Sequence, residues 1–264
     1  MDRQKLAELI TNASAEDFST FDSGGYKPSI INPYNQPEFV GSYDVGRDIG
    51  VVIPNLDESL REEFNLGPEY RAVGLLSGRV GALEIVRAVD EGVKSTNTKV
   101  AKVELCRDTM GGAGHGCTVV VAGENVADCR QAIEIALDWL PKTYGDVYVC
   151  GSGHIILHYI ANAGPAVSFA FGAPLGKPFG MVVGAPAAIG MVMADTALKS
   201  GSIEKISYMD AVDGGAKLTN EVILTFTGDA GAVKSATLAA REKGLGLLAS
   251  WGEIPRSMTA PLIR

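Results

Sequence analysis

Apolar and polar positions along this chain follow two periods, one typical of helices and one typical of β-strands. Leu83, Val86, Val89 and Val93 recur three or four residues apart, which predicts a helix with one apolar face. The same period predicts two further long helices, with inward residues Val126, Cys129, Ile133 and Leu137 in one and Val233, Ala236 and Ala240 in the other.

Short apolar runs bounded by glycine, proline or polar residues predict the strands. They lie at 49–53, 72–76, 100–105 and 118–122 in the first half, and at 154–160, 179–183, 203–209 and 221–227 in the second. Two short helices are predicted at 57–64 and around 165–171, and Asp57 and Asn125 are predicted N-caps. Strands and helices in this order indicate an α/β (α+β) fold, with helices packed against small sheets.

The two halves of the chain repeat each other. The strand 74–78 and the helix ending at Lys94-Ser95 have a second copy in the strand 180–184 and the helix ending at Lys199-Ser200, 105 or 106 residues later. Upstream, the run 49–53 has its counterpart in 155–159. Glycines, strand centres and helix ends keep one register over roughly 100 residues, so the sequence predicts a duplicated domain.

The repeat divides the chain into four predicted parts. Residues 1–44 form an N-terminal extension and linker, 45–148 the first domain, 149–255 the second domain and 256–264 a C-terminal tail. In the extension, Leu6, Leu9 and Ile10 have helical spacing, and the stretch 19–37 is rich in Ser, Gly, Asn and Pro. A short apolar stripe on a tethered helix predicts a partner surface for it.

Charge and hydropathy exclude two classes of partner. The chain has 264 residues and a formal charge of −8, with no basic cluster of the kind that nucleic acids and anionic membranes attract. The stretches 159–176 and 179–194 carry no charge, but glycines and prolines interrupt both of them. They predict buried strand–loop–helix segments rather than membrane spans.

Candidate catalytic and metal-binding residues are few. The four cysteines form no Cys-x-x-Cys pair and read as reduced cytosolic thiols, and three histidines are too few for a multi-histidine metal site. His154 and His158 lie on one strand, about 13 Å apart when extended, which favours structural roles. His115 beside Cys117 suggests a thiol nucleophile, but no third orienting group is evident. We therefore predict no catalytic residue, no metal and no cofactor.

A glycine-rich segment at 107–117 lies between two predicted strands. A phosphate-binding loop would lead into a helix, whereas this one leads into a strand. Its glycines therefore predict a long connection whose backbone comes close to something else, such as a symmetry axis.

Several motifs resemble those of one known family. Gly180-Met-Val with the helix end Ala194-Asp-Thr-Ala-Leu-Lys-Ser200, and the segment 227–237, resemble the shell domain of bacterial microcompartments (BMC). Segments 38–41, 70–74, 94–98 and 107–116 resemble its tandem-domain branch, so the similarity covers roughly residues 38 to 255.

The resemblance implies a fold and a function. It implies two circularly permuted BMC domains, and a homotrimer that mimics a hexamer and tiles the facets of a microcompartment shell in the cytoplasm. Other shell proteins, enclosed enzymes and small polar metabolites (alcohols, diols or aldehydes) are the implied partners. It also implies a small channel between the two domains of each subunit.

The resemblance also assigns roles to particular residues. It places two loops at the central pore, with Gly111, Gly112, Ala113, Gly114 and His115 in one and Asp213, Gly214 and Gly215 in the other. It places Lys94 and Lys199 at tile edges, and turns Leu6, Leu9 and Ile10 toward cargo. The acidic run before Gly214 departs from single-domain relatives, and three copies of Asp213 around an axis would disfavour anions.

Two other functions fit the sequence. A duplicated ligand-sensing regulator would bind a small molecule between its domains and form a discrete oligomer without sheets. An enzyme would depend on His115 and Cys117. The shell protein is the favoured hypothesis.

Overall fold

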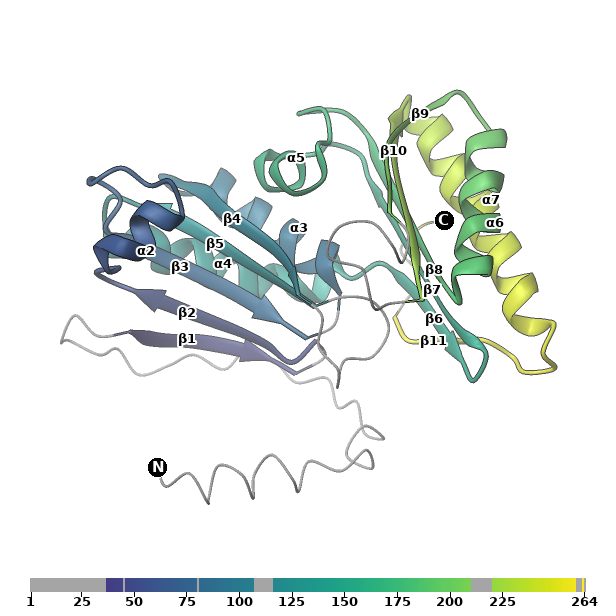
Figure 1. The fold of residues 1–264 in the computed structure, drawn as a ribbon, viewed down its shortest axis with the longest axis horizontal. Coiled ribbons are helices and arrows are strands. Elements are labelled where there is room, and N and C mark those ends of the chain that lie inside the picture. Colours follow the sequence, from purple (N-terminus) through teal and green to yellow (C-terminus); the bar gives the residue numbers. More distant parts are fainter. Residues whose placement is uncertain are drawn as a thin grey trace, which may run out of the picture.

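Two antiparallel β-sheets, each with a pair of long helices on one face, make up the protein in our computed structural model (Figure 1). The structure describes residues 37–44, 46–79, 81–106, 116–209, 220–259 and 263. The elements of the first half are β1 (Glu38–Tyr43), β2 (Asp48–Ile53), α2 (Glu58–Glu63), β3 (Ala72–Gly78), α3 (Ala82–Lys94), β4 (Thr98–Cys106), β5 (Gly116–Gly123) and α4 (Val126–Thr143). Those of the second half are β6 (Asp146–Cys150), β7 (Gly153–Ile160), α5 (Pro165–Phe171), β8 (Phe179–Ala185), α6 (Ala187–Lys199), β9 (Ile203–Met209), β10 (Val222–Gly228), α7 (Ala230–Ala249) and β11 (Arg256–Ser257).

The two sheets have the same topology. The first has the order β1-β2-β3-β5-β4, and the second has β6-β7-β8-β10-β9 with β11 added beside β6. Helices α3 and α4 cover one face of the first sheet and α6 and α7 the matching face of the second, while α2 lies on the opposite face of the first sheet (Figure 1). The predicted duplication and the predicted α/β layers are therefore confirmed.

Within the described residues the predicted elements are present, and three strands found there were not predicted. These are β1, β6 and β11, of which β1 pairs with β2 although it lies inside the predicted extension 1–44. The upstream register of the repeat differs from the prediction by one residue. Gly50 pairs with Leu76, and Leu157 pairs with Val182, the residue of β8 that matches Leu76 after 106 positions. Gly50 therefore matches Leu157, and Asp48 rather than Ile49 matches Ile155.

Local chemistry explains where the helices begin and end. Asp57 accepts a hydrogen bond from the N–H of Ser59 at 3.0 Å, and Asn125 accepts one from the N–H of Asp128 at 2.8 Å, which confirms both predicted caps. Helix α5 begins with a proline at its first position and ends at Gly172, whose φ of 67° is in the left-handed region that glycine adopts freely.

The main apolar core continues from one half of the chain into the other. It joins residues of α3, α4 and the first sheet to residues of α5, β7 and β8. A second cluster lies between the second sheet and helices α6 and α7, and a third lies beneath α2. Among the described residues, no helix is long and apolar enough to cross a membrane.

Candidate assembly surfaces

Helix α3 of the first half packs against the second half, where α5 and the outer face of the second sheet meet it (Figure 1). We call this contact the internal junction. At its centre, Oδ1 of Asp90 accepts a hydrogen bond of 2.7 Å from the N–H of Ala166, in the first turn of α5. The ammonium of Lys94 lies 3.1 Å from the other Asp90 oxygen. A buried carboxylate thus fixes α5 of one domain to α3 of the other.

The rest of the internal junction is apolar and closely packed. It encloses a cavity of about 20 Å³, which has room for about one water molecule. Residues of both halves line it: Gly81, Ala82, Glu84, Leu105, Ile156, Phe171, Met181, Val183 and Ile223. The cavity lies where the resemblance implies a channel between the domains.

Buried polar groups border this cavity and form what we call the polar seam. Nε2 of His158 on β7 lies 3.4 Å from Oε1 of Glu84 on α3, and both side chains are fully buried. On the same side of the first domain, the hydroxyl of Tyr144 donates a 3.0 Å hydrogen bond to Oδ2 of Asp48 on β2. The guanidinium of Arg87 donates to the carbonyl of Thr143 at 3.1 Å. The seam therefore joins β2, α3 and the end of α4 to β7.

Burial is the main cause of the pKa shifts of Asp48 and Tyr144 in the seam. The pKa of Asp48 is raised to about 7, chiefly by burial; the Tyr144 hydrogen bond lowers it in part, and the nearby charge of Glu84 adds to the rise. Burial, followed by the charge of Asp48, also raises the pKa of the Tyr144 hydroxyl. Asp48 is therefore the carboxyl that exchanges its proton near neutral pH.

Helix α6 repeats α3, yet its matching face has no partner among the described residues. Positions 105 residues apart match along the two helices. Val86 of α3 is 0% exposed, whereas its match Met191 on α6 is 56% exposed. Asp90 is buried in the internal junction, whereas its match Asp195 is exposed and forms an ion pair of 2.7 Å with Lys199.

The outer face of the first sheet is a second surface that lacks a partner among the described residues, in addition to the α6 face. In the second sheet the same face is buried under α3, at residues such as Ile156 and Met181. In the first sheet α2 covers only one part, and Val51, the match of the buried His158, is half-buried. Phe39 and Ile49 at the β1–β2 edge are exposed. The chain thus presents one α3-like face and one open sheet face, each of which matches a surface that it buries internally.

Comparison with known proteins gives this repeated architecture a family. The BMC domain model matches twice, at residues 72–152 and 179–257. The chain belongs to the BMC-domain family. The predicted resemblance to tandem-domain shell proteins is confirmed, because PduB and EtuB shell proteins are among the relatives of this BMC protein.

The relatives are similar over most of their length. The bacterial microcompartment shell protein PduB of Limosilactobacillus reuteri is 45% identical over 219 residues, which cover 83% of this chain and 92% of PduB. The crystal structure of a trimeric shell protein PduB matches with a TM-score of 0.80 and 44% identity, over 86% of this chain and 99% of that one. EtuB from Clostridium kluyveri matches with a TM-score of 0.81 and 44% identity, over 89% and 99%.

Some predicted site residues can be placed and others cannot. Lys94 and Lys199 end α3 and α6 as predicted, with Lys94 partly shielded by Asp90 and Glu91 and Lys199 largely exposed. The predicted pore residues 111–115 and 213–215 and the N-terminal residues Leu6, Leu9 and Ile10 lie outside the described residues. Their roles stay predictions.

Histidine and cysteine positions have structural surroundings. His154 lies 2.6 Å from Glu221 and His158 lies near Glu84, so each faces a carboxylate rather than the other histidine. Within the described ranges no group of three or more metal-ligating side chains occurs. Cys117 is fully buried, and its predicted neighbour His115 lies outside the described residues. Burial raises the pKa of Cys129 to about 12, which keeps that thiol protonated.

The junction roles of Asp90, Glu84 and Asp48 were not predicted from the sequence, and for His158 the sequence predicted only a structural role. One signal pointed to Asp90, because it lies on the same helical face as Leu83, Val86 and Val93. A charged residue within an apolar stripe indicates a buried partner. The seam joins residues up to 110 positions apart, so local periodicity carries no trace of it.

Proposed function

We propose that this protein is a structural shell protein of a bacterial microcompartment. Three copies close into a ring with the outline of a hexamer, and the rings tile the flat facets of the shell in the cytoplasm. The main observation behind the proposal is that the two repeats bury only one of their two equivalent junctions within the chain. Each chain buries one α3-type junction internally and leaves the two halves of a second one, the α6 face and the outer face of the first sheet, open.

A head-to-tail contact explains both open surfaces. The α6 face of one copy packs on the first sheet of the next copy, as α3 packs on the second sheet within the chain. Such a heterologous contact forms a ring when the rotation per subunit closes. Six similar domains from three chains then meet around one axis, in agreement with the trimeric PduB that this chain resembles.

The pores follow from the same arrangement. Around the axis, the loops with residues 111–115 and 213–215 line a central opening that small polar metabolites cross, and Asp213 disfavours anions there. The internal junction with its small cavity provides the site of a second, narrower passage in each subunit. The role is structural, with no catalytic residue, metal or cofactor.

The remaining partners attach at the periphery. Lys94 and Lys199 face neighbouring tiles and other shell proteins, and the N-terminal extension with Leu6, Leu9 and Ile10 holds enclosed enzymes in the lumen. Deleting residues 2–36 is therefore expected to leave the ring intact and to weaken co-purification of the enclosed enzymes. Collapse of the ring on this deletion would contradict the assignment of the extension.

Light scattering and negative-stain electron microscopy of the purified protein test the proposal. A mass of three chains and three-fold discs that join into sheets are expected. Monomers, or a discrete oligomer that binds a small ligand tightly and never forms sheets, would favour the duplicated regulator instead. Turnover lost on Cys117→Ser with assembly unchanged would favour an enzyme.

A further inference from the structure

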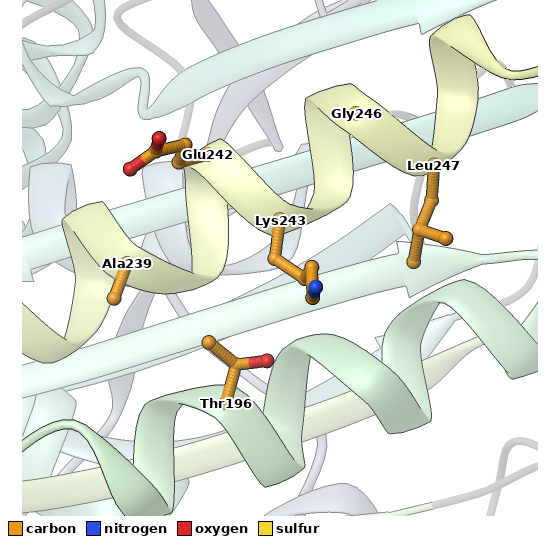
Figure 2. A pocket seen from close by; sticks show the side chains of 6 residues that line it. All are labelled: Thr196, Ala239, Glu242, Lys243, Gly246 and Leu247. Carbon is orange, nitrogen blue, oxygen red and sulfur yellow. The ribbon is translucent and has the colours of Figure 1, made fainter.

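A groove of about 510 Å³ runs between α6 and α7 on the outside of the second domain (Figure 2). Thr196 points from α6 toward α7, and Lys243 and Leu247 point from α7 toward α6. The small residues Ala239 and Gly246 leave the space open, and a side chain at Gly246 would meet nothing within 4 Å. Glu242 lies beside Lys243 at the rim.

The matching helix pair of the first domain carries larger side chains at two of these positions. By the pattern of buried residues, α4 matches α7 with an offset of 104, so Trp139 corresponds to Lys243 and Lys142 to Gly246. The Lys142 ammonium lies 4.7 Å from the centre of the Trp139 ring. Gly92 also brings α3 close to the backbone of Ala132 on α4. The open groove is thus a property of the second domain.

Ring closure leaves the groove uncovered. The internal junction serves as the template for the contact between copies, and it leaves Asp138 and Lys142 exposed and Trp139 38% exposed. The matching positions on α7 therefore lie outside the contacts that close the ring. The groove is therefore open to a partner outside the ring.

An exposed apolar knob lies next to the groove. Trp251 is 73% exposed and Ile254 is 87% exposed, and Trp251 follows the groove residue Leu247 by one turn. The knob is held in place, because the Glu253 carboxylate accepts a hydrogen bond of 2.6 Å from the N–H of Gly151. Gly252, with a φ of 85°, turns the chain just after Trp251. Large apolar side chains held this far into solvent mark a contact surface.

We propose that the groove binds the Trp251–Ile254 knob of a second copy in a neighbouring ring, across a local two-fold axis. This inference rests on the ring proposed above. A surface with a knob beside a groove is self-complementary, because each copy supplies both parts. The rim charges fit the same symmetry, since Glu242 of each copy meets Lys243 of the other. A buried tryptophan at the centre and ion pairs at the rim are typical of specific protein contacts.

Sedimentation velocity over a range of protein concentrations tests the contact by comparing single rings with associated rings. Trp251→Ala and Gly246→Lys are both expected to raise the concentration needed for ring association at least about tenfold. Gly246→Lys introduces the residue that the first domain carries at Lys142, so it fills the groove without disturbing the helix. Ser235→Glu, at an exposed position elsewhere on α7, is the matched control and leaves association unchanged.

Charge reversal tests the symmetry itself. Glu242→Lys and Lys243→Glu each place like charges together and weaken association, and the double variant Glu242→Lys/Lys243→Glu restores it. Rescue by the double variant is not expected from a purely structural role of either residue.

The ring mass is measured in every sample, which separates this inference from the proposed function. Variants that associate like the wild type while the rings stay intact would overturn the groove contact alone. The same holds for a double variant that stays weak, whereas wild-type rings that never associate would also contradict the tiling of the shell. A wild-type chain that forms no ring would overturn both proposals.

Discussion

The two halves of this chain share one architecture but treat matching surfaces in opposite ways. Val86 on α3 is fully buried by the second half, whereas Met191, in the same place on α6, is more than half exposed. The polar seam differs too. Glu84 and His158 face each other in the internal junction, whereas Ile189 and Val51 occupy the matching positions of the open surfaces. The contact between the two domains of one chain thus contains a buried polar pair, whereas the proposed contact between copies is apolar at the same positions.

This division has a physical rationale. A buried polar pair with few partners is costly unless its geometry is fixed, and covalent connection of the two domains fixes it. A contact between separate chains gains most from apolar area, which is less demanding in orientation. Both surfaces of the proposed ring contact follow the second pattern.

Met191→Glu is expected to have the largest effect, because it places a charge at the centre of the proposed contact between copies. Burying an unpaired carboxylate costs several kcal/mol, enough to separate a ring of ordinary affinity into single chains. Light scattering measures the mass, and circular dichroism confirms that the chain is folded. Ser235→Glu is the control, because its match Gln131 stays exposed beside the internal junction. Rings that survive Met191→Glu would place the contact elsewhere.

Asp48→Asn tests the polar seam through pH. Asp48 keeps its proton up to a pKa of about 7 in the folded chain, compared with about 3.9 for an unfolded aspartate. Between these values the folded state binds more protons, so its stability falls as pH rises from about 4 to about 7 and stays low above. The loss contributed by Asp48 is at most about 4 kcal/mol.

Asparagine accepts the same Tyr144 hydrogen bond without ionising. Asp48→Asn is therefore expected to flatten the stability profile between pH 4 and 7 and to stabilise the chain at pH 8 by about 1–3 kcal/mol. Urea unfolding across this pH range measures the effect. A variant whose profile runs parallel to that of the wild type would refute the role given to Asp48.

Asp90→Ala and Asp195→Ala compare the same residue type at the two junctions. Removing Asp90 leaves the N–H of Ala166 without its acceptor, at an expected cost of about 1–3 kcal/mol. Removing Asp195 breaks an exposed ion pair with Lys199 and is expected to change the stability of the single chain by less than about 1 kcal/mol. Thermal unfolding of both variants in the Met191→Glu background isolates the chain from the ring. Equal losses would mean that Asp90 does not fix α5.

Lys94→Ala and Lys199→Ala are expected to have the smallest effect on folding, about 0–1 kcal/mol each, since both lysines end helices at partly exposed positions. Their proposed role concerns the edges of tiles. Electron microscopy is expected to show intact discs with fewer ordered sheets. Sheets as extensive as those of the wild type would leave the lysines as simple helix ends.

Much of the fold could be predicted from the sequence because its signals are local. The stripe Leu83–Val93 and the caps at Asp57 and Asn125 have the effects that their spacing predicts. Register was harder, because Asp48 and Gly50 interrupt the apolar pattern on the helix-facing side of β2, whereas their matches Ile155 and Leu157 are apolar. The short strands β1, β6 and β11 depend on neighbours far along the chain.

The candidate surfaces could be predicted only in part. The duplicated helix ends drew attention to Lys94 and Lys199, but which face of each helix is covered depends on how the two domains dock. Nothing in the sequence of α6 distinguishes an exposed Met191 from a buried one. Only the comparison with the buried Val86 in three dimensions shows that this face lacks a partner among the described residues.

The central claim is that the α6 face of one copy packs on the first sheet of the next, and a mixing experiment tests it most directly. Met191→Glu disrupts only the α6 face, and Val51→Asp disrupts only the sheet face, at the position that matches the buried His158. Each variant alone is expected to be monomeric. Mixed in equal amounts, they are expected to form a complex of two chains by light scattering, because one intact face of each kind remains and the ring cannot close. Monomers in the mixture, or rings formed by either variant alone, would contradict the head-to-tail contact.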